Sequence, residues 1–138
     1  MKKLLLSLSI LFVFASFSYA DFTGKWLVES KKSIVDIQKC GDSLCGTIVW
    51  LKEPTYEDGT EKVDKENENE TLRNRKIKGI KMIYGFRKEG NEWVEGKIYN
   101  PNDGKTYDSN MKLNEDGTLA LDGCVWILCK TQTWTKAN

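Results

Sequence analysis

Apolar residues recur at every second position through most of the chain after residue 21, and this alternation constrains the fold more than any other feature. A period of two is typical of β-strands with one buried face. The stretch "FTGKWLVES" places Phe22, Trp26 and Val28 on one face, and "TYDSNMKLN" aligns Tyr107 with Met111. Short turns rich in Gly, Asp and Asn separate the alternating segments. The pattern predicts an all-β domain.

Eight strands are predicted, and most of them are joined by tight turns. Such an up-and-down succession favours a closed barrel, because closure removes the exposed edges of a sheet. The interior of an eight-stranded barrel is wide enough for side chains or for one small ligand. Only the charged segment at about 52–78 lacks the alternation, which indicates a long loop with room for one helical turn. The prediction is a single antiparallel β-barrel at residues 21–138.

Two central strands have clear predicted orientations. In "GIKMIYGFRK" the alternation puts Ile80, Met82, Tyr84 and Phe86 on one face. In "EWVEGKIYN" it groups Val94, Gly96 and Ile98 on one side and Trp93 and Tyr99 on the other. We therefore expect Tyr84 to point inward and Trp93 to lie on the face opposite Ile98.

The chain begins "MKKLLLSLSILFVFASFSYADF", which has the parts of a secretory signal peptide. Lys2 and Lys3 supply the positive region, Leu4 to Phe17 the apolar region, and Ser18 and Ala20 the small residues of a cleavage site. The apolar region is short for a bilayer span, and no later stretch is apolar for long enough to cross one. We predict a cleaved signal peptide at residues 1–20, a periplasmic or secreted protein, and no membrane span in the mature chain.

Four cysteines form two pairs of equal spacing, Cys40 with Cys45 and Cys124 with Cys129. In an oxidising compartment an even number of thiols indicates disulfides. The C-x-x-x-x-C spacing fits neither a zinc site nor a thioredoxin-like redox motif. We favour bridges within each pair over a crossed pairing, with Cys40 and Cys45 facing each other across the last pair of a hairpin. Each bridge would close a short loop and add about 2 kcal/mol.

The chain contains no histidine, and this excludes several classes of chemistry. A Ser-His-Asp triad, a Cys-His pair and an imidazole metal ligand all need that residue. Any catalysis would rest on carboxylates, Lys, Tyr or Ser, so enzyme activity is not favoured and no metal or cofactor is predicted. Without Lys2 and Lys3 the chain has 19 basic and 20 acidic residues, a net charge near −1. That balance gives no electrostatic reason to expect binding to nucleic acid or to an anionic membrane, both of which favour a basic excess.

Longer motifs carry a resemblance to a known family. Gly24-x-Trp26 looks like the signature of lipocalin-like barrels, and the series "CGDSLCGTIVWL", "LRNRKIKGIKMIYGF", "WVEGKIYNPNDGKTY" and "GCVWILCKTQTWTK" resembles, in that order, the exported bacterial proteins of domain-of-unknown-function family 2147. The resemblance spans nearly all of Phe22 to Lys136. It implies a lipocalin-like β-barrel in the periplasm and no known reaction. At Lys130 we expect arginine in many relatives, which weakens any role that needs a bidentate contact there.

The last strand carries the strongest candidates for ligand binding. Lys130, Gln132 and Trp134 alternate with threonines and share one face, which is inward if Trp134 is in the core. Barrel closure would place them beside Trp26, and an amine and an amide near two tryptophans would suit a small molecule with an anionic or carbonyl head. The alternative is that Lys130 lies in water at the barrel mouth and Gln132 bonds to neighbouring backbone.

Arg73 and Arg75, at the end of the long loop, allow two interpretations. They would clamp a carboxylate or phosphate at the cavity mouth, or they would tether the loop through acids such as Asp64 or Glu70. Leu72 is expected to plug one end of the barrel. The candidate ligand-binding residues are Trp26, Arg73, Arg75, Tyr84, Tyr107, Lys130, Gln132 and Trp134.

The sequence thus favours a periplasmic binding or carrier protein for a small, partly apolar ligand. The first alternative is a protein-interaction module of the cell envelope, with a filled barrel and the 52–78 loop as its contact surface; the sequence identifies no protein partner. The second alternative is a carboxylate-dependent enzyme.

Overall fold

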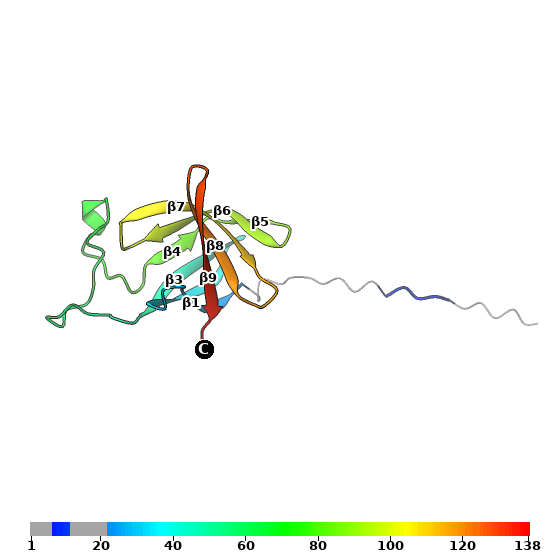
Figure 1. Ribbon diagram of the computed structural model, residues 1–138, viewed down its shortest axis with the longest axis horizontal. Helices are drawn as coiled ribbons and strands as arrows, with labels where there is room; N and C mark the ends of the chain where they lie inside the picture. The colour runs from blue at the N-terminus through cyan, green and yellow to red at the C-terminus, as the bar shows by residue number, and fades with distance from the viewer. Residues whose placement is uncertain (1–6, 12–21) are drawn as a thin grey trace, which may run out of the picture.

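The computed structural model describes residues 7–11 and 22–138, so most of the predicted signal peptide lies outside the described residues. In this part of the chain the structure has nine β-strands and one short 3-10 helix, and Figure 1 shows the strands wrapped into one body. Their bounds are β1 Gly24–Leu27, β2 Ser33–Cys40, β3 Ser43–Leu51, η2 Glu70–Leu72, β4 Lys81–Tyr84, β5 Arg87–Glu89, β6 Glu92–Asn100, β7 Lys105–Leu113, β8 Leu119–Val125 and β9 Leu128–Lys136.

Eight of the strands close into an antiparallel barrel, as the sequence predicts. The order is β4-β3-β2-β1-β9-β8-β7-β6, and β4 pairs with β6 to complete the ring. The first and last barrel strands meet where Trp26 pairs with Lys136 and Leu27 with Thr135. The additional strand, β5, pairs with β6. The long β3–β4 connection, residues 52–80, holds η2 and two isolated β-bridges.

One half of the barrel is filled by aromatic side chains. Trp26, Trp93 and Trp134 are almost completely buried. The indole N–H of Trp26 donates to the carbonyl of Phe22 at 2.8 Å, so its polar atom is satisfied inside the core. The Phe22 ring meets the Trp93 ring edge-on, with 6.4 Å between the ring centroids. This packing gives the closed half of the barrel a solid core.

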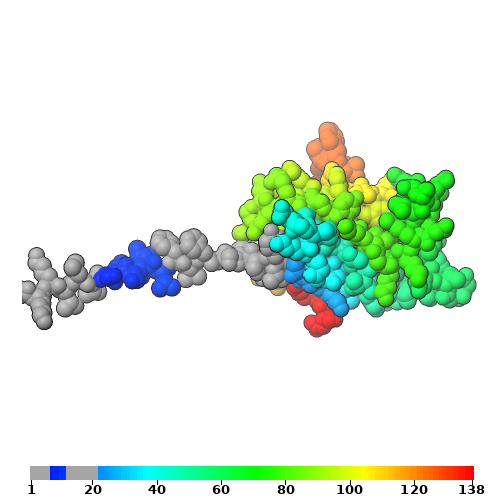
Figure 2. Space-filling view, turned by 180° about the vertical axis from the view of Figure 1, so that it is seen from behind, coloured from blue at the N-terminus to red at the C-terminus, as the bar shows by residue number. Residues whose placement is uncertain are grey.

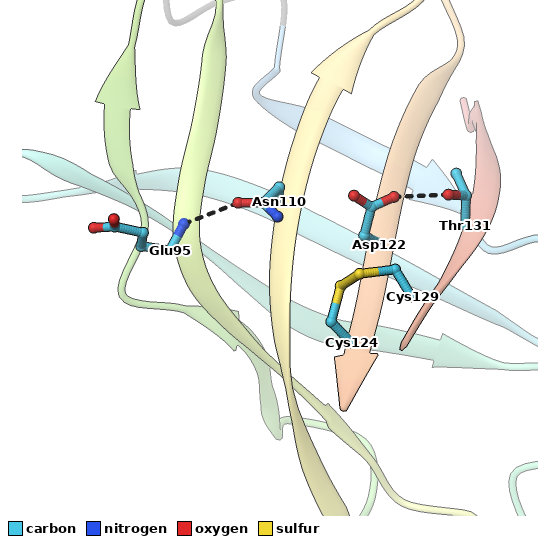
Figure 3. Close-up of a disulfide and its surroundings, with 6 residues drawn as sticks. All are labelled: Glu95, Asn110, Asp122, Cys124, Cys129 and Thr131. Carbon is cyan, nitrogen blue, oxygen red and sulfur yellow. Dashed lines mark hydrogen bonds between the residues drawn. A yellow bond between two sulfur atoms is a disulfide. The ribbon is translucent and has the colours of Figure 1, made fainter. Parts of the chain in front are cut away.

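A β-bulge in β6 makes the predicted orientation of Trp93 wrong. The register with β7 shifts between Trp93 and Gly96, and Glu95 has a φ of 57°. The Glu95 N–H donates to the side-chain oxygen of Asn110 at 3.1 Å, which satisfies the irregular backbone (Figure 3). An extra residue reverses the alternation beyond it, so Trp93, Gly96 and Ile98 are all buried.

The predicted orientation of Tyr84 is also wrong. Ile83 is buried, whereas Tyr84 is exposed. The register between β3 and β4 shifts between Gly46 and Thr47. Ile83 occupies the space beside Gly46, where a Cβ atom would lie only 2.6 Å from the Ile83 side chain. The strand end therefore rotates Ile83 rather than Tyr84 into the core.

Both predicted disulfides are present, Cys40–Cys45 and Cys124–Cys129. Cys124 and Cys129 are direct partners across the β8–β9 hairpin. Cys40 instead pairs with Ser43, so its bridge to Cys45 runs diagonally, and the expectation that these two cysteines face each other is wrong. The reason is a tighter turn than predicted, with only residues 41 and 42 between β2 and β3.

Candidate functional site

An open cavity of about 820 Å³ occupies the other half of the barrel. It lies at the end where β3, β6 and β8 finish and the 52–80 connection starts. Inward residues of four strands form its apolar wall, namely Ile48, Met82, Ile98 and Leu121. Alternation directs these side chains inward, and no tryptophan of the described residues lines the cavity. The barrel is therefore neither completely filled nor hollow throughout.

Charged side chains surround the cavity mouth. The four basic ones are Lys32, Lys52, Lys62 and Lys130, and the three acidic ones are Glu29, Glu53 and Asp122. Each acidic group has a contact within the protein. Glu53 lies 3.6 Å from Lys62, Glu29 accepts the Thr133 backbone N–H at 2.7 Å, and Asp122 accepts the Thr131 hydroxyl at 2.7 Å.

Lys32, Lys52 and Lys130 have no carboxylate within ion-pairing distance in the part of the chain that the structure describes. All three are exposed. The mouth therefore presents ammonium groups that are available to an anionic group.

Three of the residues predicted from the sequence line this cavity: Tyr107, Lys130 and Gln132. The side-chain oxygen of Gln132 accepts the Trp134 indole N–H at 3.1 Å, which fixes the orientation of the amide. The Tyr107 hydroxyl donates to the Asp103 carboxylate, and that hydrogen bond raises the pKa of the phenol. Tyr107 therefore stays neutral at physiological pH and offers its ring to the cavity.

Three other predicted residues lie elsewhere. Trp26 and Trp134 are completely buried and do not line the cavity, and Tyr84 is on the outer surface. The Trp26 ring instead lies 4.4 Å below the ammonium of Lys136, which also donates to the Thr23 carbonyl at 2.7 Å. Trp134 contributes to the cavity only indirectly, because it orients the amide of Gln132.

Arg73 and Arg75 hold the 52–80 connection in place and do not line the cavity. Arg75 Nε lies 2.9 Å from an oxygen of Asp64, a carboxylate with no solvent exposure. Arg73 Nε donates to the Asn67 carbonyl at 2.7 Å and its guanidinium lies 3.8 Å from Glu70. These contacts correspond to the tethering interpretation of the two arginines.

Asp64 joins this connection to the barrel. The Tyr99 hydroxyl of β6 donates to Asp64 Oδ1 at 2.6 Å, and the Asn67 amide donates to Oδ2 at 2.9 Å. Burial and the Asp64 hydrogen bond raise the pKa of Tyr99 to about 12, against a coulombic effect of Arg75 that lowers it. A buried carboxylate needs such partners. The polar cluster therefore orders a segment that contributes Glu53, Lys62 and Ile77 to the cavity.

A glycine of the β6–β7 turn also packs against the connection. Gly104 is buried, and a Cβ atom there would lie 1.8 Å from the carbonyl oxygen of Glu66. Leu72 is exposed at the surface of the connection, so the expectation that it plugs a barrel end is wrong. The three residues of η2 project outward and none of them is buried.

Sequence reasoning missed several residues of this region. Lys32 and Lys52 directly flank predicted strands, a position typical of a barrel rim, so a signal for them existed. Asp64 lies among seven other acidic residues of the long segment, and nothing in its local sequence distinguishes it. Its partner Tyr99 is assigned to an outer face by alternation, which does not reveal that a loop covers that face.

Two kinds of feature are absent from the residues that the structure describes. Residues 7–11 and 22–138 contain no group of three or more His, Cys, Asp or Glu side chains placed to hold a metal ion. No helix in the described ranges is long and apolar enough to cross a membrane.

A family model and a solved structure are both similar to this chain over most of its length. The model of the family described as "Uncharacterized protein conserved in bacteria (DUF2147)" matches residues 24–136. The solved structure of protein HP1028 from the human pathogen Helicobacter pylori, which is described as belonging to the lipocalin family, is similar with a TM-score of 0.71 and 28% sequence identity. The similarity covers 84% of this chain and 82% of that chain. No curated protein matches.

Proposed function

From the premise that this chain belongs to the bacterial DUF2147 family and has a lipocalin-like barrel, we propose that it binds a small, partly apolar molecule in its open cavity. The observation that carries the proposal is an apolar wall beneath a mouth with unpaired lysines. A ligand with an apolar body and an anionic or carbonyl head fits both parts.

The wall and the mouth of the cavity would bind different parts of the ligand. Ile48, Ile98 and Leu121 exclude water from the apolar body of a ligand, at about 25 cal/mol for each Å² of apolar surface removed from water. Lys130 and the Gln132 amide lie on one strand above that wall and offer donors to the head group. Few polar groups over an apolar surface are typical of small-molecule sites.

We also propose that the protein acts in the periplasm. The signal-like sequence at residues 1–20 supports this location, and so do two disulfides, which persist in oxidising compartments. A carrier or sequestering role for a molecule of the envelope is consistent with both. The carboxylates of the cavity mouth already have partners within the protein, so binding accounts for this site without a reaction.

Fluorescence titration with 1-anilinonaphthalene-8-sulfonate tests the proposal, because this probe combines an apolar ring system with an anionic sulfonate. We expect saturable binding, weakened about tenfold in the Lys130→Ala, Gln132→Ala double variant. The matched control is Lys112→Ala, an exposed lysine of β7 that does not line the cavity. Equal affinities in all three proteins, or no saturable binding by a protein that unfolds cooperatively, would refute the proposal.

Native mass spectrometry of protein purified from its own cells gives a second test. A bound small molecule of defined mass is expected. An empty barrel that co-purifies with another protein would favour the envelope-interaction alternative instead.

A further inference from the structure

The tip of the β8–β9 hairpin exposes four consecutive apolar side chains. Residues 125–128, here called the apolar tip, are Val125, Trp126, Ile127 and Leu128, and 61 to 84% of each is exposed. Figure 1 shows this hairpin extending beyond the other strands, and Figure 2 shows it as a projection from the surface. Isolated exposed apolar residues are ordinary, whereas a contiguous exposed group marks a contact surface.

The residues of the apolar tip are not the ones that its turn favours. Val125 pairs with Leu128, which leaves Trp126 and Ile127 as a two-residue loop, and Trp126 has a φ of 55°. Turns of this kind favour Gly or Asn at such a position. The turns at Gly41, Gly90 and Gly117 of this chain use glycine for the same purpose, at φ values of 61°, 59° and 84°. A bulky indole there costs stability, so its presence points to a role outside the folded barrel.

The base of the hairpin holds the apolar tip away from the barrel. The Cys124–Cys129 disulfide joins the residues that flank the tip, and the Asp122–Thr131 hydrogen bond joins the strands just below (Figure 3). Both contacts restrict folding of the tip back onto the core. Trp126 and its neighbours are therefore presented to solvent on a rigid stem.

The apolar tip and the unpaired lysines are at the same end of the barrel. In the antiparallel ring, the β1–β2 turn with Lys32, the end of β3 with Lys52 and the end of β8 all lie at this end. Lys130 follows Cys129 directly, at the foot of the tip. Of these lysines, Lys130 alone lies next to the tip, whereas Figure 1 shows the β1–β2 turn and the end of β3 well away from the end of the hairpin. An apolar projection with an exposed ammonium group at its foot complements a surface with negative charge outside and hydrocarbon beneath.

We propose that the apolar tip inserts into the surface of a bilayer containing anionic phospholipids, with Lys130 at the foot of the tip facing the lipid phosphates. All four consecutive side chains of the tip are apolar and exposed, so a fluid bilayer that encloses the tip would cover all of them, whereas a flat protein surface would cover one side. Trp is favoured at membrane interfaces, and each basic residue near an anionic surface adds attraction. The inference does not depend on what the cavity holds.

Vesicle flotation tests the proposal with protein of residues 22–138. This segment contains every barrel strand, both disulfides and the whole described core, and it omits the apolar region at 4–17, which would bind vesicles itself. The probes are vesicles of phosphatidylethanolamine with phosphatidylglycerol, and vesicles of phosphatidylcholine alone. We expect flotation with the anionic vesicles and about fivefold weaker partitioning with the neutral ones, or with the anionic ones at about 0.5 M salt.

The decisive variant is Trp126→Gly with Ile127→Asn, because it places glycine at the position with positive φ while removing the apolar surface. It should fold at least as stably as the parent protein, so a loss of binding cannot be due to unfolding. We expect vesicle partitioning to fall at least about tenfold and anilinonaphthalene sulfonate binding in the cavity to remain unchanged. Failure of the parent protein to float with anionic vesicles would overturn the proposal, as would equal flotation of the variant. A tip that occupies a groove of another protein would give the first of these results.

Discussion

Substitution of Gly104 by alanine should release the 52–80 connection from the barrel. The added Cβ would lie 1.8 Å from the Glu66 carbonyl oxygen and 2.5 Å from its carbon, and both are backbone atoms that no rotamer change can move. The φ of +72° adds a penalty of about 1 kcal/mol for a residue other than glycine. Overpacking against backbone costs about 1 to 3 kcal/mol more. We expect the free energy of unfolding to fall by about 2 to 4 kcal/mol, the sum of these two costs.

Gly117→Ala is the matched control, because it separates the two costs. Gly117 has a φ of +84°, and a Cβ added there would have no described atom within 4 Å, so this variant carries the backbone penalty alone. Guanidinium denaturation followed by tryptophan fluorescence gives the unfolding free energy of each protein, and limited proteolysis reports release of the connection. If Gly104→Ala and Gly117→Ala agree within about 0.5 kcal/mol and the connection stays resistant to protease in both, the packing argument is refuted.

Three other substitutions test the cavity, a buried hydroxyl and the contact between Tyr99 and the 52–80 connection. Gly123→Leu should reduce binding of the sulfonate probe about tenfold without unfolding the protein, because a Cβ there meets its nearest atoms at 3.9 Å and Gly123 lines the cavity; unchanged probe affinity would count against the cavity as the site. Ser109→Ala should leave stability unchanged or raise it by about 1 kcal/mol in denaturant titrations, since the buried Ser109 hydroxyl has no partner within the described residues. Tyr99 has a folded pKa of about 12 against an ordinary 10.0, so its neutral form stabilises the fold fully below pH 10 and that contribution is lost as the pH rises from 10 toward 12. The stability advantage of the parent over Tyr99→Phe should therefore shrink over that interval, and an advantage that stays constant there would contradict the assignment.

Alternation alone predicts the barrel because most inward positions carry large apolar residues that only one face of a strand can bury. It fails for Trp93 and Tyr84, where one irregular residue changes the face of everything beyond it. A bulge leaves no reliable mark in a single sequence, since Glu95 is an ordinary residue for a straight strand. The disulfide partner of Cys40 is predicted correctly, but its cross-strand neighbour is Ser43 and not Cys45, because the length of a tight turn determines the register of its hairpin.

The candidate site, like the fold, can be predicted only where it depends on the local sequence. Lys130 and Gln132 are predicted from the last strand because its alternation is uninterrupted up to Trp134. The roles of Asp64 and Arg75 depend on contacts between residues far apart in the chain, such as the one with Tyr99, and the local sequence carries no information on them. Loop conformation is determined by the surface on which the loop packs, and that surface exists only after the barrel has closed.

Each disulfide joins cysteines only five positions apart, whereas a mispaired bridge between Cys45 and Cys124 would span 79 positions. The probability of loop closure falls with about the three-halves power of loop length, so the correct partner is encountered roughly sixty times more often during oxidation of the unfolded polypeptide. Oxidative maturation of this protein should consequently reach the native pairing directly, with little scrambling and little need for an isomerase.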